Sequence, residues 1–186
     1  MQVKRAPSLS RSIGMSCLAV VAAAGAAMAQ PAPAFEPRVG QQGKDVVWVP
    51  TPNTLVDRML DMAKVTPADY VIDLGSGDGR TVIAAAKRGA KAHGIEYDQN
   101  MVDLSIRNAA AAGVGDRASF VQGDLFKSDF SGATVLTMFL LPDINLRLRP
   151  TILDMKPGTR VVSHDFDMGD WPADQRLRVP DRKSVV

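Results

Sequence analysis

The sequence predicts an α/β protein built on a doubly wound, mostly parallel sheet of the Rossmann-like kind. Short apolar stretches alternate with helical ones between residues 45 and 163, and this alternation implies right-handed βαβ units with helices on both faces of a sheet. A glycine-rich turn at residues 73–80 (DLGSGDGR) joins the first strand to a helix. Ligands of such sheets bind outside the carboxyl ends of the strands, so we expect the ligand at this turn.

Composition is that of an ordinary globular domain, with 46% hydrophobic and 23% charged residues in a chain of 186. The formal net charge of +2 is too close to zero to argue for a nucleic-acid partner. Cys17 is the single cysteine, which rules out a disulfide or a multi-cysteine metal site within the chain. Asp165 and Asp167 suggest a metal by their spacing, but no third ligand follows convincingly, so no metal is assigned.

The first 29 residues have the three parts of a secretory signal: a basic start, an apolar stretch over residues 15–27 and a small-residue cleavage site ending at Ala29. We therefore expect an exported protein, periplasmic or secreted, without a membrane span after cleavage. The alternative is a misassigned start, which would leave the protein cytoplasmic. Residues 30–44 are rich in proline and glycine and predict a linker, so the folded domain is expected at 45–186.

The first expected helix starts at Pro52, with Thr51 as its capping residue. Its apolar residues recur on one helical face, which should pack on the sheet. The later elements follow in order: strand 70–73, helix 81–88, strand 91–96, helix 101–112, strand 118–122, apolar run 133–141, helix 143–155 and strand 159–163. Pro150 is expected to break or restart the last helix.

The glycine-rich turn favours a particular ligand chemistry. Glycine at positions 75, 77 and 79 permits positive φ and close approach of the backbone to a ligand. A dinucleotide-binding turn would put a diphosphate at the helix N-terminus, but here the third glycine comes one residue early. Asp73 and Asp78 would also repel a diphosphate. The turn therefore prefers a ligand that carries ammonium, sulfonium or hydroxyl groups.

Two further acids follow the next two strands. Glu96 lies about 20 residues after the turn, the spacing at which a βαβ unit places a carboxylate over ribose hydroxyls. Asp124 ends the third strand and has the chemistry to accept a hydrogen bond from an exocyclic amine such as adenine N6. Together with Asp73, these carboxylates describe a crevice for a nucleoside.

These segments resemble a known family. Residues 73–80, 94–98 (GIEYD) and 123–126 (GDLF) look like the first three motifs of class I, seven-β-strand S-adenosylmethionine-dependent methyltransferases. Residues 49–52 (VPTP), 140–142 (LLP) and 156–164 (KPGTRVVSH) are similar to the group that contains ATP-synthase c-subunit lysine methyltransferases. The resemblance implies methyl transfer from S-adenosylmethionine to an acceptor nucleophile, with a protein lysine as the expected acceptor. The family's sheet normally ends in an antiparallel pair, which we expect to be incomplete here.

The resemblance also implies the site. The expected cofactor-binding residues are Thr51, Asp73, Gly75, Ser76, Gly77, Asp78, Glu96, Tyr97, Asp124 and Leu125. The expected substrate-binding residues are Phe139, Leu140, Leu141 and Pro142, an apolar slot that would favour a neutral amine. No catalytic residue is assigned, because the methyl donor is already activated and the protein contributes mainly alignment.

Other functions stay open at this point. The crevice is also compatible with a non-catalytic or vestigial nucleoside-binding domain, with a methyltransferase acting on a small molecule, and with an NAD-dependent enzyme. Thr51 is interpreted equally well as a plain helix cap, and Met138 equally well as buried strand core. Asp78 has the alternative role of capping the helix that follows the turn. The sequence leaves the acceptor and the oligomeric state undecided.

Overall fold

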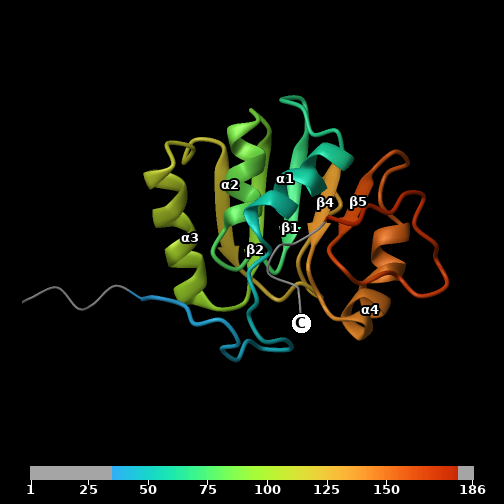
Figure 1. Ribbon diagram of the computed structural model, residues 1–186, viewed down its shortest axis with the longest axis horizontal. Helices are drawn as coiled ribbons and strands as arrows, with labels where there is room; N and C mark the ends of the chain where they lie inside the picture. The colour runs from blue at the N-terminus through green and yellow to red at the C-terminus, as the bar shows by residue number, and fades with distance from the viewer. Residues whose placement is uncertain (1–34, 180–186) are drawn as a thin grey trace, which may run out of the picture. The chain divides into compact units, whose positions relative to one another are not determined.

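A computed structural model describes residues 35–179 of the chain. The expected signal at residues 1–29 and the first residues of the expected linker lie outside the described part. The sheet within it is parallel, in the order β3-β2-β1-β4-β5 (Figure 1). The strands are β1 (Tyr70–Leu74), β2 (Lys91–Glu96), β3 (Ala118–Gln122), β4 (Val135–Met138) and β5 (Arg160–Ser163). The helices are α1 (Asn53–Met62), α2 (Arg80–Lys87), α3 (Gln99–Ala111) and α4 (Pro142–Leu153).

Alternation along the central strand divides the core between the two faces of the sheet. Val71 packs with buried residues of α1, α2 and α3, such as Leu60 and Val82. Ile72 and its neighbours on the same face pack with α4, whose Leu148 is buried. Because successive side chains of a strand point to opposite faces, one five-residue strand supports both layers. The predicted doubly wound parallel sheet is therefore confirmed.

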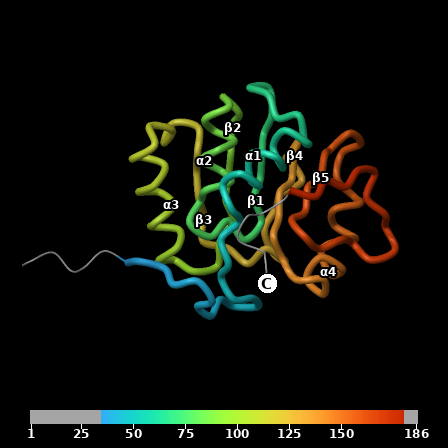
Figure 2. Tube along the Cα trace, viewed as in Figure 1, coloured from blue at the N-terminus to red at the C-terminus, as the bar shows by residue number. Residues whose placement is uncertain are grey.

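The chain reverses direction across the sheet at β1. This strand pairs in parallel with β2 on one side and with β4 on the other. The connections after β1 and β4 therefore diverge and leave a crevice at the carboxyl ends of these strands, the usual ligand position in such sheets. Residues 38–50, which precede α1, pass across this end of the sheet (blue to cyan in Figure 2).

Two predictions about helix boundaries are wrong. Helix α1 begins at Asn53, with Pro52 at the cap position and no side-chain capping bond, because the Thr51 hydroxyl is bonded to His164 instead. Helix α4 continues through Pro150 rather than breaking there. Pro150 is exposed, as is Leu146 one turn earlier, so the carbonyl that loses its intrahelical donor lies on the solvent side of the helix.

Strand β4 is shorter than the apolar run that predicted it. It ends at Met138, and Phe139, Leu140 and Leu141 leave the sheet before α4 starts at Pro142. These three apolar residues therefore line the crevice and are not part of the strand. After β5, the described residues contribute only an isolated bridge between Met168 and Trp171. Within residues 35–179, no helix is both long and apolar enough to cross a membrane.

Candidate functional site

A cavity of about 310 Å³ opens at the carboxyl ends of β1, β2 and β4. All ten residues expected to bind the cofactor line it, from Thr51 to Leu125. Phe139, Leu140 and Leu141 line it as well, whereas Pro142 does not and instead starts α4. The structure thus brings the motifs into one space, although their individual roles remain predictions.

The glycine turn forms one wall, and its shape admits only glycine at two positions. Gly75 has φ +73°, and a Cβ on it would lie 3.1 Å from Leu140 Cδ2. Gly77 has φ +55°, and a Cβ there would lie 2.7 Å from Trp48 Nε1. Ser105 Oγ donates to the Gly77 carbonyl at 2.8 Å and holds the turn against α3. The backbone can therefore approach a ligand closely at both positions.

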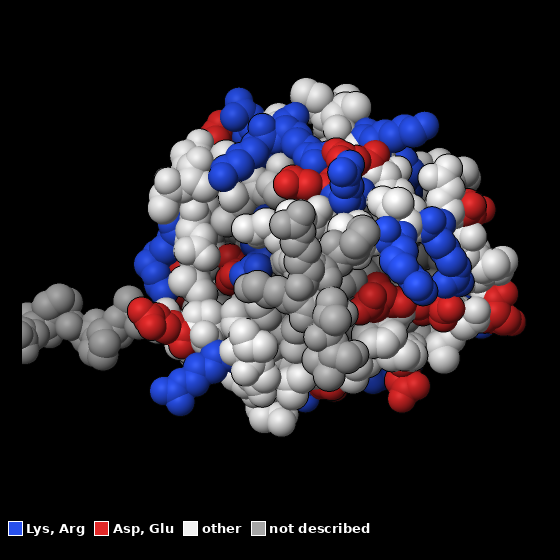
Figure 3. Space-filling model, viewed as in Figure 1, with Lys and Arg blue, Asp and Glu red and all other residues white. Residues whose placement is uncertain are grey.

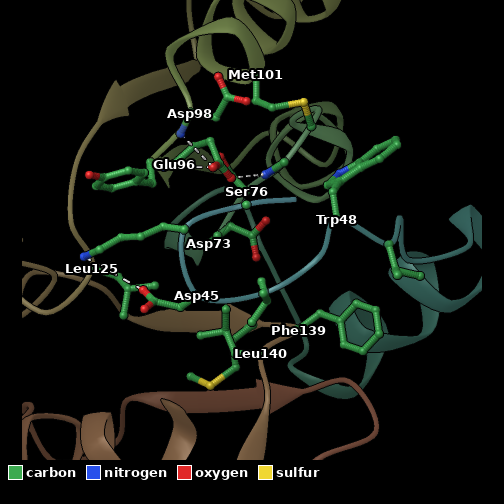
Figure 4. Close-up of a pocket in the computed structure, with 18 of the residues that line it drawn as sticks. Asp45, Trp48, Asp73, Ser76, Glu96, Asp98, Met101, Leu125, Phe139 and Leu140 are labelled. Atoms are coloured by element: carbon green, nitrogen blue, oxygen red, sulfur yellow. Dashed lines mark hydrogen bonds and ion pairs between the residues drawn. The ribbon is translucent and has the colours of Figure 1, made fainter. Parts of the chain in front are cut away.

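Glu96 is anchored by the backbone that surrounds it. Its Oε2 accepts from the Gly77 N–H at 2.9 Å, and its Oε1 accepts from the N–H groups of Tyr97 and Asp98 at 2.8 and 3.0 Å. A carboxylate has about four lone-pair sites, so acceptor capacity is left for the cavity. Figure 4 shows the Glu96 carboxylate beside Ser76 and Asp98 at the edge of the pocket. This arrangement suits a pair of ribose hydroxyls.

Asp73 is the buried carboxyl of the site, at the end of β1. Thr137 Oγ1, on the neighbouring β4, donates to its Oδ1 at 2.6 Å. Burial raises the pKa of Asp73 to about 7, and the negative charges of Glu96 and Asp78 add to the effect, while the Thr137 hydrogen bond opposes it. A ligand ammonium nearby would favour the ionised carboxylate.

Ser76 supplies an unpaired polar group. Its Oγ is buried and has no hydrogen-bond partner among the described residues. The hydroxyl packs against β2, where a Cβ built on Gly94 would lie 2.5 Å from Ser76 Oγ. In Figure 4, Asp73 lies between Leu125 and Phe139, with Ser76 just above it. The polar groups therefore occupy the middle of the cavity.

Asp78 is neutralised by its neighbour in the turn. Arg80 donates from Nη2 to Asp78 Oδ2 at 2.6 Å and from Nε to Oδ1 at 2.9 Å. The same guanidinium donates from Nη1 to the Thr51 carbonyl at 3.0 Å. Asp78 therefore organises the contact between the turn and the start of α1. The cap position of α2 is Gly79, in the left-handed conformation, and not Asp78.

Lys44 forms an ion pair with Asp124, the third of the expected acids. No signal in the sequence indicates this contact. Lys44 Nζ donates to Asp124 Oδ2 at 2.8 Å and lies 4.8 Å from the centroid of the Tyr97 ring. The hydrogen bond to Asp124 raises the pKa of Lys44 and lowers the pKa of Asp124. Lys44 and the preceding Gln41, Gln42 and Gly43 lie in the expected linker, yet they line the cavity.

The opposite end of the cavity is apolar. Its wall includes Met59, Met138, Phe139, Ile144 and Phe166. Behind the wall, the His164 ring packs on Phe139 with a centroid separation of 3.9 Å. The sequence favours a packing role for His164 and places it close enough to the fifth strand to face the crevice, but it misses Trp48 and Phe166. Among residues 35–179, no group of three His, Cys, Asp or Glu side chains is placed to hold a metal.

Comparison with known proteins identifies the family. Residues 73–175, more than half of the chain, match the family model described as "ANTKMT methyltransferase domain". The chain belongs to this methyltransferase family. It is 46% identical over 139 residues to a "Protein-lysine N-methyltransferase" of Saccharolobus islandicus, covering 73% of this chain and 86% of that protein.

Two other similarities bear on this methyltransferase. It is 34% identical over 128 residues to the ATP-synthase c-subunit lysine N-methyltransferase of Xenopus laevis, covering 68% of this chain and 56% of that protein. The methyltransferase thus spans little more than half of that relative. The crystal structure of an RNA methyltransferase from Salinibacter ruber, in complex with S-adenosyl-L-homocysteine, has a TM-score of 0.69 and 52% identity, covering 70% of this chain and 87% of that one.

The cofactor of this methyltransferase is S-adenosylmethionine. The similar Salinibacter ruber methyltransferase was crystallised with S-adenosyl-L-homocysteine, the product form of this cofactor. The cavity fits the molecule, because it offers a buried carboxyl for an ammonium group and an anchored carboxylate for ribose. The expected enzyme class and cofactor are therefore confirmed.

Proposed function

We propose that this enzyme methylates the side-chain amine of lysine residues in proteins. The observation that carries the proposal is the apolar end of the cavity, which lies directly against the cofactor turn. The contact is close, since a Cβ on Gly75 would come within 3.1 Å of Leu140. The names of the Saccharolobus islandicus and Xenopus laevis relatives support the same acceptor.

The chemistry of the apolar end suits a lysine. S-adenosylmethionine, when bound, supplies a methyl group activated by its sulfonium. The acceptor amine must be neutral to attack, but a lysine in water has a pKa of about 10.4. Phe139, Ile144 and Phe166 form a wall that disfavours the charged ammonium, because burial lowers the pKa of an amine. The long methylene chain of lysine matches such a slot.

An RNA acceptor is the competing possibility, since the similar Salinibacter ruber protein is named an RNA methyltransferase. RNA binding depends on Lys and Arg that contact phosphates. On the face seen in Figure 3, basic and acidic side chains are interspersed. Asp143 and Asp165, which directly precede the slot residues Ile144 and Phe166 in the sequence, are exposed acids. Acids at this position favour a cationic lysine segment over a phosphate backbone.

The test offers both classes of acceptor to the purified full chain. The recombinant c-subunit of ATP synthase, a histone mixture and total RNA are each incubated with S-adenosylmethionine carrying a tritiated methyl group. We expect label in protein, recovered as Nε-methyl-lysine after hydrolysis. Histones acetylated beforehand should remain unlabelled, because their amines are blocked.

The variant Asp73→Ala is the matched control for the enzyme, and it should abolish the labelling. Label confined to RNA would contradict the proposal, as would labelled protein that yields no methyl-lysine. Failure of S-adenosylhomocysteine to bind in calorimetry would instead show that the purified chain lacks a working cofactor site.

A further inference from the structure

Three side chains form a connected path from the apolar end of the cavity to the surface. Thr51 lines the cavity and is only 7% exposed. Its Oγ1 lies 3.1 Å from Nδ1 of His164, a residue 113 positions later in the chain. On the other side of the imidazole, Nε2 lies 3.6 Å from Oδ2 of Asp165, whose side chain is 69% exposed. The cofactor motifs include neither the imidazole nor the carboxylate.

The two neighbours of the imidazole determine its tautomer. Burial lowers the pKa of His164 and outweighs the opposing effect of Asp165, so the ring is neutral near pH 7 and carries a single N–H. Asp165 Oδ2, at 3.6 Å from Nε2, is too far for a hydrogen bond, but its negative charge favours the hydrogen on this nitrogen. Nδ1 is then an acceptor. The Thr51 hydroxyl must donate to it, and the oxygen keeps its lone pairs for the cavity.

The backbone around Asp165 holds this arrangement in place. Asp165 has φ +62°, a left-handed conformation that is uncommon for a residue other than glycine. The Phe166 N–H donates to the His164 carbonyl across it at 2.8 Å. This tight turn places the carboxylate next to the ring of the preceding residue. Residues held in such conformations often belong to functional sites.

The other side chains that line this end give an amine no hydrogen-bond partner. Besides Thr51, the described residues that line it are Met59, Met138, Phe139, Leu140, Leu141, Ile144 and Phe166. A neutral lysine amine has two N–H groups and one lone pair, and the lone pair must point at the methyl group. An acceptor oxygen that takes one N–H therefore restricts the direction of the lone pair.

We propose that Thr51 Oγ1 accepts a hydrogen bond from the acceptor amine and directs the amine's lone pair at the methyl group, while His164 and Asp165 keep Thr51 in the acceptor orientation. The proposal rests on the proposed lysine acceptor. The ammonium first releases a proton to water. The nitrogen lone pair then forms the N–C bond as the C–S bond breaks, and that electron pair goes to sulfur. Thr51 is the catalytic residue, and His164 and Asp165 are positioning residues.

The experiment compares isosteric substitutions at each position in the full chain. Thr51→Val removes the hydroxyl, and Thr51→Ser retains it. His164→Leu removes the ring acceptor, whereas His164→Asn keeps an oxygen close to the position of Nδ1. For each protein we would measure the rate of methyl transfer to the recombinant c-subunit of ATP synthase and the Kd of S-adenosylhomocysteine. Binding of n-butylamine to the S-adenosylhomocysteine-loaded protein at pH 9 would be measured by ligand-observed NMR.

We expect Thr51→Val and His164→Leu to lower kcat about tenfold, in line with the loss of one hydrogen bond at a buried site. Both should weaken n-butylamine binding, and the Kd of S-adenosylhomocysteine should stay within about twofold of the unsubstituted protein. Thr51→Ser and His164→Asn should restore most of kcat. The cofactor Kd shows at the same time that each variant is folded.

Three outcomes would overturn the inference. Thr51→Val with an unchanged kcat and unchanged n-butylamine binding would remove Thr51 from the acceptor site. A tenfold loss of S-adenosylhomocysteine affinity with kcat unchanged would assign Thr51 to the cofactor. Equal losses in His164→Leu and His164→Asn would reduce His164 to packing on Phe139. Failure of the proposed function would look different. The unsubstituted enzyme would then leave the protein acceptor unmethylated, whereas Thr51→Val would still weaken n-butylamine binding.

Discussion

Replacing Asp73 with asparagine should stabilise the cofactor-free protein, most strongly at alkaline pH. The carboxyl is 6% exposed, and its pKa in the folded state is about 7, compared with an ordinary value of 3.8. A raised folded-state pKa means that the folded protein binds this proton more tightly than the unfolded chain. Stability therefore falls as pH rises from about 4 to 7, and the penalty is complete above that range.

The magnitude follows from the shift. Each pKa unit corresponds to about 1.36 kcal/mol, so about three units correspond to roughly 4 kcal/mol at pH 8. Between pH 5 and pH 8 the penalty should grow by about 2 to 3 kcal/mol. Asparagine cannot ionise, and its amide oxygen can still accept from Thr137, so Asp73→Asn should lack this dependence. Other titrating groups are present in both proteins and cancel in the difference.

The assay is urea unfolding of both proteins at pH 5, 6, 7 and 8, followed by tryptophan fluorescence. We expect the free energy of unfolding of Asp73→Asn to exceed that of the unsubstituted protein by an amount that increases with pH. The same substitution should weaken S-adenosylmethionine binding, because the ammonium loses its carboxylate. Parallel pH curves for the two proteins would refute the reasoning and would show that Asp73 titrates normally.

Two further predictions concern the packing of the glycine turn and the contact between Lys44 and Asp124. Gly79→Ala should destabilise the protein by about 3 kcal/mol in urea unfolding, because its Cβ would lie 2.8 Å from the Phe120 ring at φ +81°. Gly113→Ala, with φ +71° and nothing within 4 Å, is the matched control and should lose only about 1 kcal/mol; equal losses would contradict the packing argument. Lys44→Met should tighten S-adenosylhomocysteine binding about two- to fivefold in calorimetry, because Lys44 no longer competes for Asp124. Weaker binding would instead mean that Lys44 helps to hold the cofactor.

The strands and the glycine turn were predictable because their signals are local. The stretch 118–122 coincides with β3, whereas the stretch 91–96, which coincides with β2, was predicted from its position between two helices. The positive φ of Gly75 and Gly77 follows from the lack of a side chain. The carboxyl-end position of Glu96 follows from strand direction, which parallel βαβ units impose.

The predictions that failed depended on contacts between distant segments. Thr51 precedes a proline and looks like a helix cap, but its hydroxyl bonds to His164 after β5. The role of Asp124 stays a prediction, but its contact with Lys44, 80 positions earlier, was missed for the same reason. Pro150 looks like a helix end, but it lies on an exposed face, where the lost hydrogen bond is tolerated.

The sequence by itself determined the fold class and the chemistry of the central turn, and the resemblance of its motifs to a known family gave the cofactor. Strand and helix patterns, glycine conformations and the spacing of acids along a βαβ unit are properties of short segments, so they can be predicted without knowing what the segments touch. The tertiary structure alone decided which side chains face each other at the two ends of the cavity. Strand order brings β4 and β5 beside β1, and this places His164 behind Thr51 and Phe139. Such pairings depend on the packing of the whole sheet, because no local interaction connects residues more than a hundred positions apart.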